Sequence, residues 1–145
     1  MTGALSHLRV FDLSRVLAGP WSSQLLADMG ADVIKIERPG SGDDTRGWGP
    51  PYLKDEAGND TTEVAYYLAA NRGKKSLTLN IAKEEAQEII RHLIKETDVF
   101  IENYKVGDMA RYGLNYEALK QINPRLVYCS ITGFGQTGPM ADVAG

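Results

Sequence analysis

Polar and charged side chains follow several apolar segments of this sequence, at the points where the chain would leave a strand. The clearest case is the stretch 30–50, where the apolar segment 33–36 runs into Arg38 and then a loop dense in Gly, Pro and Asp. Pro39 lacks an amide donor and restricts the residue before it, so the strand ends there. A loop of this composition at the carboxyl end of a strand is where open α/β sheets bind ligands. We therefore expect a binding site at this junction.

Basic residues recur in or beside other predicted loops. Arginine forks and lysine point charges gathered at strand ends suit a ligand with several phosphates. For any single basic residue a solvated surface position is the simpler interpretation, but repetition across separate loops favours one shared rim. The residues concerned are Arg38, Arg46, Arg72, Lys74, Lys75, Lys105 and Arg111.

The Asp, His and Cys residues give weaker evidence for a metal site or a catalytic site. The pair Asp43 and Asp44 has no His or Cys nearby, and such a pair in a loop more often forms a turn or caps a helix than binds a metal. Neither His7 nor His92 has a visible acid or base partner. Cys129, the single cysteine, lies in an apolar segment, where we expect it to be buried and inert. We expect no metal and assign no catalytic residue in this chain.

The segment 133–138, GFGQTG, satisfies the G-x-G-x-x-G pattern of dinucleotide binding. A Rossmann fingerprint belongs on the first βα turn and needs an acidic residue about 20 positions later, whereas Pro139 follows here at once. We therefore expect a flexible loop and no nicotinamide cofactor. The first βα turn, 14–20, can instead present the backbone donors of Leu17 and Ala18 beside a helix start, with plain packing onto the sheet as the alternative.

The elements that must position these residues alternate between strand and helix. This alternation predicts an α/β fold with a Rossmann-like, mostly parallel sheet flanked by helices. In the first helix we expect the helical spacing of Leu25, Leu26 and Met29 to face the core. The predicted strands are 9–13, 32–37, 76–80, 98–102 and 126–132; the helices are 21–30, 61–70, 83–96, 107–111 and 115–122, with a long loop at 38–62.

Bulk properties narrow the class of protein. With 145 residues the chain can bury one ordinary core, and a net charge of −3 argues against nucleic acid as a partner. No apolar run approaches the roughly 20 residues of a membrane-spanning helix, so we expect no membrane partner and a cytoplasmic location. The sequence ends directly after a Gly- and Pro-rich loop, which indicates part of a longer protein.

Five blocks of sequence, taken in order, resemble the family III coenzyme A transferases, whose relatives include the α-methylacyl-CoA racemases. The blocks are VFDLSRVLAGP at 10–20, GADVIKIERPGSGDDTRGWGPP at 30–51, YYLAANRGKKSLTLN at 66–80, DVFIENYKVGDMARYGL at 98–114 and INPRLVYCSITGFGQTGP at 122–139. The resemblance implies that residues 1–145 are the N-terminal part of the coenzyme A-binding large domain. It also implies an interlaced homodimer for the full-length protein.

The resemblance further implies which residues bind coenzyme A or an acyl-CoA. Leu17 and Ala18 would contact the nucleotide through their backbone, and Arg38 would lie against the adenine and phosphates. The groove would be completed by Leu79, Asn80, Asn103, Tyr104, Lys105 and Arg111.

The implied reaction is transfer of coenzyme A from an acyl-CoA to a carboxylic acid through an aspartyl intermediate. The block at 42–51, GDDTRGWGPP, is similar to that of transferases acting on dicarboxylic acids. In the family's pattern the aspartate nucleophile lies beyond Gly145, and Asp142 is not assigned that role. The alternatives are a racemase-like proton transfer beside the thioester carbonyl, and a coenzyme A-binding fragment without catalysis.

Overall fold

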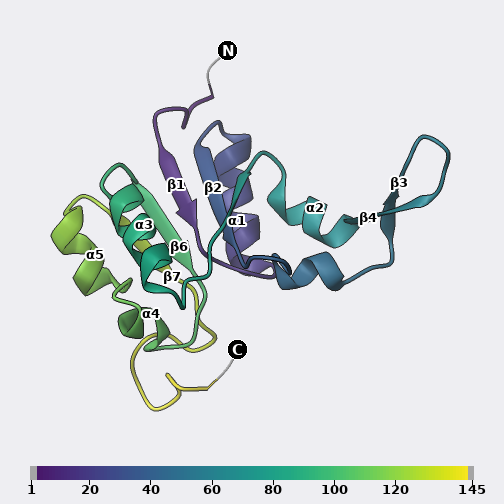
Figure 1. The fold of residues 1–145 in the computed structure, drawn as a ribbon. Helices are drawn as coiled ribbons and strands as arrows, with labels where there is room; N and C mark the ends of the chain where they lie inside the picture. The colour runs from purple at the N-terminus through teal and green to yellow at the C-terminus, as the bar shows by residue number, and fades with distance from the viewer. Residues whose placement is uncertain (1–2, 144–145) are drawn as a thin grey trace.

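A single parallel sheet organises the computed structural model, which describes residues 3–143 (Figure 1). The strand order is β5-β2-β1-β6-β7, and every neighbouring pair in this sheet is parallel. The predicted α/β class is therefore confirmed. The strands are β1 (Arg9–Asp12), β2 (Asp32–Glu37), β5 (Lys75–Thr78), β6 (Val99–Glu102) and β7 (Val127–Ser130).

Helices cover both faces of this sheet because side chains alternate along each strand. Phe11 and Phe100 point to one face, where their rings stack 6.0 Å apart within the larger core cluster. Val10 and Ile101 point to the other face, in a smaller cluster beneath α1. The helices are α1 (Ala18–Asp28) on the smaller cluster, and α3 (Glu84–Ile94), α4 (Asp108–Arg111) and α5 (Tyr116–Ile122) on the larger one.

Helix α1 turns a different face to the sheet from the one its apolar spacing predicts. Leu26 packs onto the smaller cluster as expected, but Leu25 and Met29 are about half exposed. The buried face instead carries Ser23 and Gln24, because polar groups beneath the helix need hydrogen-bond partners. Ser23 Oγ donates to Asp12 Oδ2, at the end of β1. Part of the apolar stripe of α1, including Leu25 and Met29, thus faces outward in this chain.

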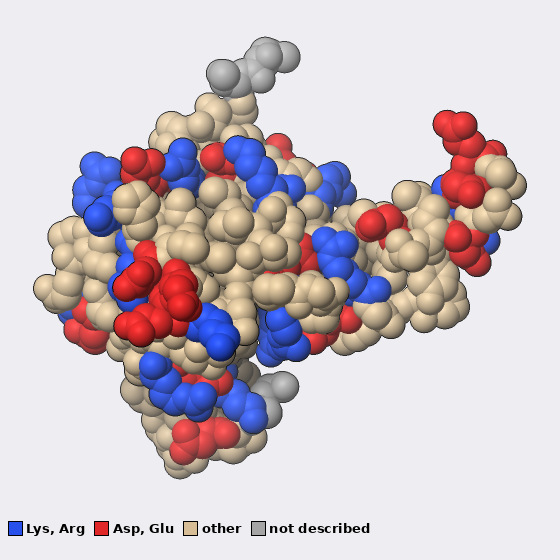
Figure 2. Space-filling model, viewed as in Figure 1, with Lys and Arg blue, Asp and Glu red and all other residues tan. Residues whose placement is uncertain are grey.

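The segment 38–62 and the predicted helix 61–70 required correction. The segment contains a 3-10 helix, η1 (Asp44–Gly47), and a strand, β3 (Tyr52–Lys54), which pairs antiparallel with β4 (Asp60–Val64). Helix α2 (Ala65–Asn71) begins only after β4. Two consecutive threonines in β4 favour a strand, which explains the misassigned helix start. Figure 1 shows this hairpin projecting from the body, and Figure 2 shows acidic side chains gathered at its tip.

Strand β7 forms one edge of the sheet, and this exposes part of it. Val127 is 60% exposed and Cys129 is also exposed, so the expectation of a buried cysteine was wrong for this chain. Beyond β7, residues 133–138 form bends and residues 139–142 a turn, and no helix follows before residue 143. Nor does any helix of residues 3–143 combine the length and apolarity needed to cross a membrane.

Candidate functional site

The strand order places a crevice between β1 and β6. The chain moves from β1 outward through β2 to β5 and then returns to the other side of β1 with β6. Loops that follow the strands on either side of such a switch point separate at the carboxyl edge, where open α/β sheets bind ligands. Here the loop after β1 is 13–17 and the loop after β6 begins at Asn103. Residues predicted to bind ligand from separate parts of the sequence therefore meet at this edge.

Two adjoining clefts open along this edge. The small cleft has a volume of about 190 Å³ and the large cleft about 780 Å³. The two clefts adjoin one another, because both are lined by Arg15, Arg38, Tyr104 and Tyr112. Leu79 and Asn80 line the small cleft; Ala18, Asn103 and Lys105 line the large cleft.

Seven of the nine predicted binding residues therefore lie on the clefts. The other two do not line them. Leu17 is the N-cap residue of α1 and is 38% exposed beside the large cleft. Arg111 lies at the end of α4, where its guanidinium pairs with Asp108 at 3.1 Å and its side chain is 70% exposed.

Asn103 uses its side chain to hold the loop after β1. Its Oδ1 accepts from the Arg15 amide at 2.9 Å, and its Nδ2 donates to the Arg15 carbonyl at 2.8 Å. Both hydrogen-bonding atoms of the Asn103 amide are thus engaged with one backbone residue. Asn103 therefore orients the first βα loop, and its place on the large cleft leaves the expected ligand contact a prediction.

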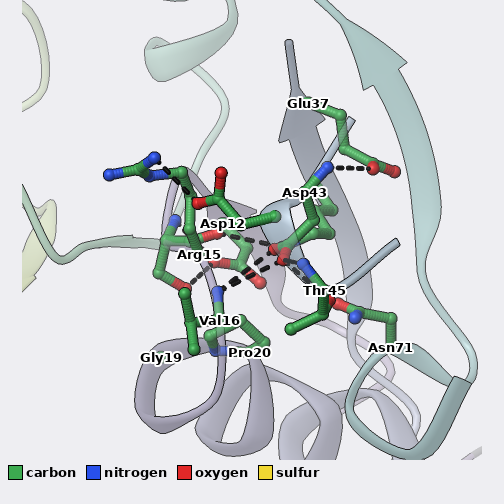
Figure 3. Close-up of polar contacts among 12 residues, drawn as sticks. Asp12, Arg15, Val16, Gly19, Pro20, Glu37, Asp43, Thr45 and Asn71 are labelled. Carbon is green, nitrogen blue, oxygen red and sulfur yellow. Dashed lines mark hydrogen bonds and ion pairs between the residues drawn. The ribbon is translucent and has the colours of Figure 1, made fainter. Parts of the chain in front are cut away.

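The same loop contains a strained residue, Val16, which has a φ of 69°. A β-branched side chain is rarely found in this left-handed region, and the cost is about 1–3 kcal/mol. Figure 3 shows Asp43 reaching this residue, and the Val16 amide lies 3.3 Å from each carboxylate oxygen of Asp43. Beyond Val16 the amides of Ala18 and Gly19 open α1, where first-turn amides lack partners within the helix. Asp43 therefore helps to hold the loop that leads into α1.

Asp43 is itself held by a buried ion pair. Lys35 Nζ lies 2.8 Å from Asp43 Oδ2, and the two side chains are 1% and 0% exposed. Lys35 Nζ also donates to the Ser14 carbonyl at 2.9 Å. Asp43 accepts from the Thr45 amide at 2.9 Å, so it caps η1 as the sequence suggested. Burial opposes ionisation of Asp43, but the hydrogen bond and charge of Lys35 lower its pKa.

A second buried pair lies beside the first. Lys74 Nζ lies 3.0 Å from Asp12 Oδ2, and both side chains are at most 2% exposed. Lys74 Nζ also donates to the Pro20 carbonyl at 2.8 Å, within α1. Burial lowers the pKa of Lys74, against the influence of Asp12. Lys35 thus ties β2 to the loop after β1, and Lys74 ties the end of β1 to the start of α1.

Glu37 organises the other side of the small cleft. Its carboxylate accepts from Arg46 Nε at 2.7 Å, Tyr67 Oη at 2.8 Å and Ser76 Oγ at 2.7 Å, while the residue is 3% exposed. Burial alone would raise the pKa of Glu37, but these hydrogen bonds outweigh it and lower the pKa to about 2. The ionised carboxylate therefore joins β2, β5, η1 and α2.

This network predicts a pH dependence of stability. The pKa of Glu37 falls from 4.5 to about 2 on folding, so its ionised form contributes stability above pH 4.5 that is lost as the pH falls toward 2. The full contribution is about 3 kcal/mol. We expect Glu37→Gln to flatten the pH dependence of the unfolding free energy in this window, measured by urea denaturation.

Glu117→Gln is the matched control, because within residues 3–143 Glu117 pairs only with Lys120, and its side chain is 69% exposed. The control should leave the same pH profile unchanged. Equal profiles for Glu37→Gln and the unaltered protein would contradict the role given to Glu37.

The predicted basic rim is only partly assembled. Arg38 and Lys105 line the clefts, whereas Arg46 is bound to Glu37. Lys75 pairs at 2.5 Å with Asp32, the first residue of β2, and thus lies toward the opposite end of that strand. Arg72 pairs with Asp28 at the end of α1, and Lys74 is buried. The prediction of one shared basic rim was therefore wrong for four residues, which are Arg46, Arg72, Lys74 and Lys75.

Sequence reasoning missed several residues of this site. Arg15 and Tyr112 line both clefts but were not among the predicted binding residues. The position of Lys35 inside the apolar segment 33–36 could have indicated a buried ion pair, because a lysine is rarely buried unless it is paired. No comparable signal marks Tyr112. Within residues 3–143, no three His, Cys, Asp or Glu side chains cluster so as to hold a metal ion.

The parallel order, the switch point and the cleft at the carboxyl edge define an α/β protein of the doubly wound class with a candidate ligand site. Comparison with known proteins identifies it further. The sequence profile of CoA-transferase family III matches residues 5–145, so the chain belongs to that family.

Several relatives are named for coenzyme A transfer. The chain is 56% identical over 141 residues to the succinate–glutarate CoA-transferase of Agrobacterium fabrum, covering 97% of this chain and 35% of that protein. It is 50% identical to the human succinyl-CoA:glutarate CoA-transferase, covering 97% and 31%. A CAIB/BAIF family protein from Brucella suis superimposes with a TM-score of 0.91 at 54% identity, covering 100% and 37%. The chain thus spans about a third of the length of these relatives.

Proposed function

We propose that this chain is the N-terminal, coenzyme A-binding part of an enzyme that transfers coenzyme A between dicarboxylic acids. The observation that carries the proposal is the convergence of Arg38, Tyr104 and Lys105 on the clefts at the carboxyl edge of the sheet. Two cations and an aromatic ring suit a nucleotide that carries several phosphates. The relatives named for succinyl and glutaryl transfer favour dicarboxylic substrates over other acids.

The proposed contacts follow the positions of the side chains. Arg38 is exposed, and no ion pair engages its side chain among residues 3–143, so its guanidinium is free to bind phosphate. Lys105 supplies a second charge in the large cleft. Leu79 offers an apolar surface and Asn80 a polar one in the small cleft, beside the adenine. The amides of Leu17 and Ala18 would complete the binding from the start of α1.

The proposed reaction proceeds through an aspartate that we place outside residues 1–145. Its carboxylate attacks the donor thioester, which releases the coenzyme A thiolate and forms a mixed anhydride. The thiolate then attacks the aspartyl carbonyl, which frees the donor acid and leaves an enzyme thioester. The acceptor carboxylate enters by the same steps in reverse, so the aspartate is regenerated. We favour transfer over racemisation because the relatives reported above are named as transferases.

We also propose that the full-length protein is an interlaced homodimer. The apolar stripe of α1 supports burial of that helix face in a larger assembly, since Leu17, Trp21, Leu25 and Met29 are each 38% to 53% exposed here.

The proposed function is tested with the full-length protein and with residues 1–145 separately. We expect the full-length protein to form glutaryl-CoA from succinyl-CoA and glutarate, measured by chromatography of the CoA esters. The isolated segment should bind coenzyme A at most, measured by calorimetry. Measurable transfer by residues 1–145 alone would refute the placement of the nucleophile, and no transfer by the full-length protein would refute the substrate class.

A further inference from the structure

Arg15 occupies an unusual position at the centre of the candidate site. It lines both clefts, and its guanidinium lies 5.3 Å from the centre of the Tyr104 ring. Its backbone is held on both sides by the Asn103 side chain, as described above. The main chain of Arg15 is therefore fixed, and only its side chain is free to reorient.

The Arg15 side chain is incompletely satisfied in this arrangement. Its Nε is buried and has no hydrogen-bond partner among residues 3–143. A buried donor left without an acceptor is costly, more so when it belongs to a charged group. A hydrogen-bond acceptor that reaches Nε would therefore favour a different orientation of the Arg15 guanidinium.

The contact that holds the guanidinium is weak. Its Nη1 pairs with Asp44 Oδ2 at 2.9 Å, and the two side chains are 36% and 41% exposed. Such solvated pairs contribute little, because water screens both charges. A phosphate group accepts two parallel hydrogen bonds from an arginine fork, through Nε and one Nη together. Exchange of Asp44 for phosphate would thus replace a weak contact and supply the missing acceptor.

We propose that Arg15 exchanges Asp44 for a phosphate group of the ligand, so that Asp44 acts as a competing anion that sets the affinity. The proposal rests on the proposed function, since it assigns a phosphate-binding residue within the same site. Substitution of Asp44 should leave the capping of η1 unaffected, because Asp43 is the residue that caps it. Substitution of Asp44 therefore alters the competing charge while the cap remains.

The exchange predicts effects of opposite sign for the two partners. Arg15→Gln should raise the Kd for coenzyme A about 10- to 100-fold, as expected for loss of a charge-assisted bidentate contact. Asp44→Asn should lower the Kd by up to about fivefold, since the pair it removes is exposed. Calorimetric titration of the full-length protein measures both constants, and the urea midpoint of each variant reports whether it folds.

The double variant distinguishes exchange from a general effect of charge. If Asp44 competes only through Arg15, Asp44→Asn should have no effect on affinity in the Arg15→Gln background. An equal gain in both backgrounds would mean that Asp44 merely repels the ligand, and would overturn the exchange. An unchanged Kd in Arg15→Gln would overturn it as well.

Titration with inorganic pyrophosphate separates this inference from the proposed function. Binding of coenzyme A without coupling between Arg15 and Asp44 would leave the proposed function intact and reject the exchange. Coupling seen with pyrophosphate, in a protein that does not bind coenzyme A, would support the exchange and reject the proposed ligand. Absence of coupling with both ligands would reject the exchange.

Discussion

Lys35→Met is expected to lower the free energy of unfolding by about 3–5 kcal/mol, the largest effect among the substitutions considered. The replacement leaves the Asp43 carboxylate at 0% exposure without its counter-charge at 2.8 Å. It also removes the donor to the Ser14 carbonyl, so the loop after β1 loses a second contact. Urea denaturation of the full-length protein, followed by fluorescence of its tryptophans, measures the change.

Lys75→Met provides the matched control from the adjacent strand. Lys75 also pairs with an aspartate, Asp32, but its side chain is 70% exposed, so the loss should stay below about 1 kcal/mol. Adding Asp43→Asn to Lys35→Met should recover part of the stability, because the unpaired buried charge is then removed. Equal losses for the two single lysine variants would contradict the importance given to burial.

Arg38→Ala is expected to raise the Kd for coenzyme A about 10- to 100-fold, with little change in stability. Arg38 follows β2 directly, is exposed and lines both clefts, so its loss would remove a proposed ligand contact and no part of the core. Calorimetry gives the Kd. The salt dependence of binding should weaken in the variant, because one charged contact with phosphate is lost.

Arg72→Ala is the control for removal of an arginine elsewhere on the surface. Arg72 pairs with Asp28 at 2.7 Å near the end of α1 and lines neither of the two clefts. Its substitution should leave the Kd for coenzyme A within about twofold of that of the unaltered protein. At this distance the effect of the lost charge would be screened by salt. If Arg38→Ala and Arg72→Ala bind coenzyme A equally well, Arg38 does not contact the ligand.

The order of strands and helices was predictable from the sequence because it depends on local features. These are the spacing of apolar residues and the Gly and Pro residues that end each element. Segment 32–37 coincides with β2, and the amphipathic pattern at 83–96 contains α3. The errors arose where distant partners decide the outcome. The face that α1 buries is set by Asp12, which needs Ser23 as a partner, and no property of the helix sequence alone reveals this. The β3–β4 hairpin likewise depends on pairing across a turn.

The candidate site was predictable in its location and less so in its roles. Arg38 and Tyr104 line the clefts because residues after parallel strands meet at one edge. Residue spacing gives no information on which polar groups bind one another. The two hydrogen bonds between the Asn103 side chain and the Arg15 backbone were therefore not predictable. The buried pair of Lys35 and Asp43 depends in the same way on two segments brought together by the fold.

The left-handed backbone at Val16 has a consequence for the kinetics of binding. Because Asp43 and Asn103 hold the loop 14–17 in the folded protein, the loop would require no separate ordering step when a ligand binds. Association then depends on diffusion and orientation, while changes in contacts appear mainly in the rate of departure. The residence time of the ligand, more than its rate of arrival, is therefore the property that the cleft residues control.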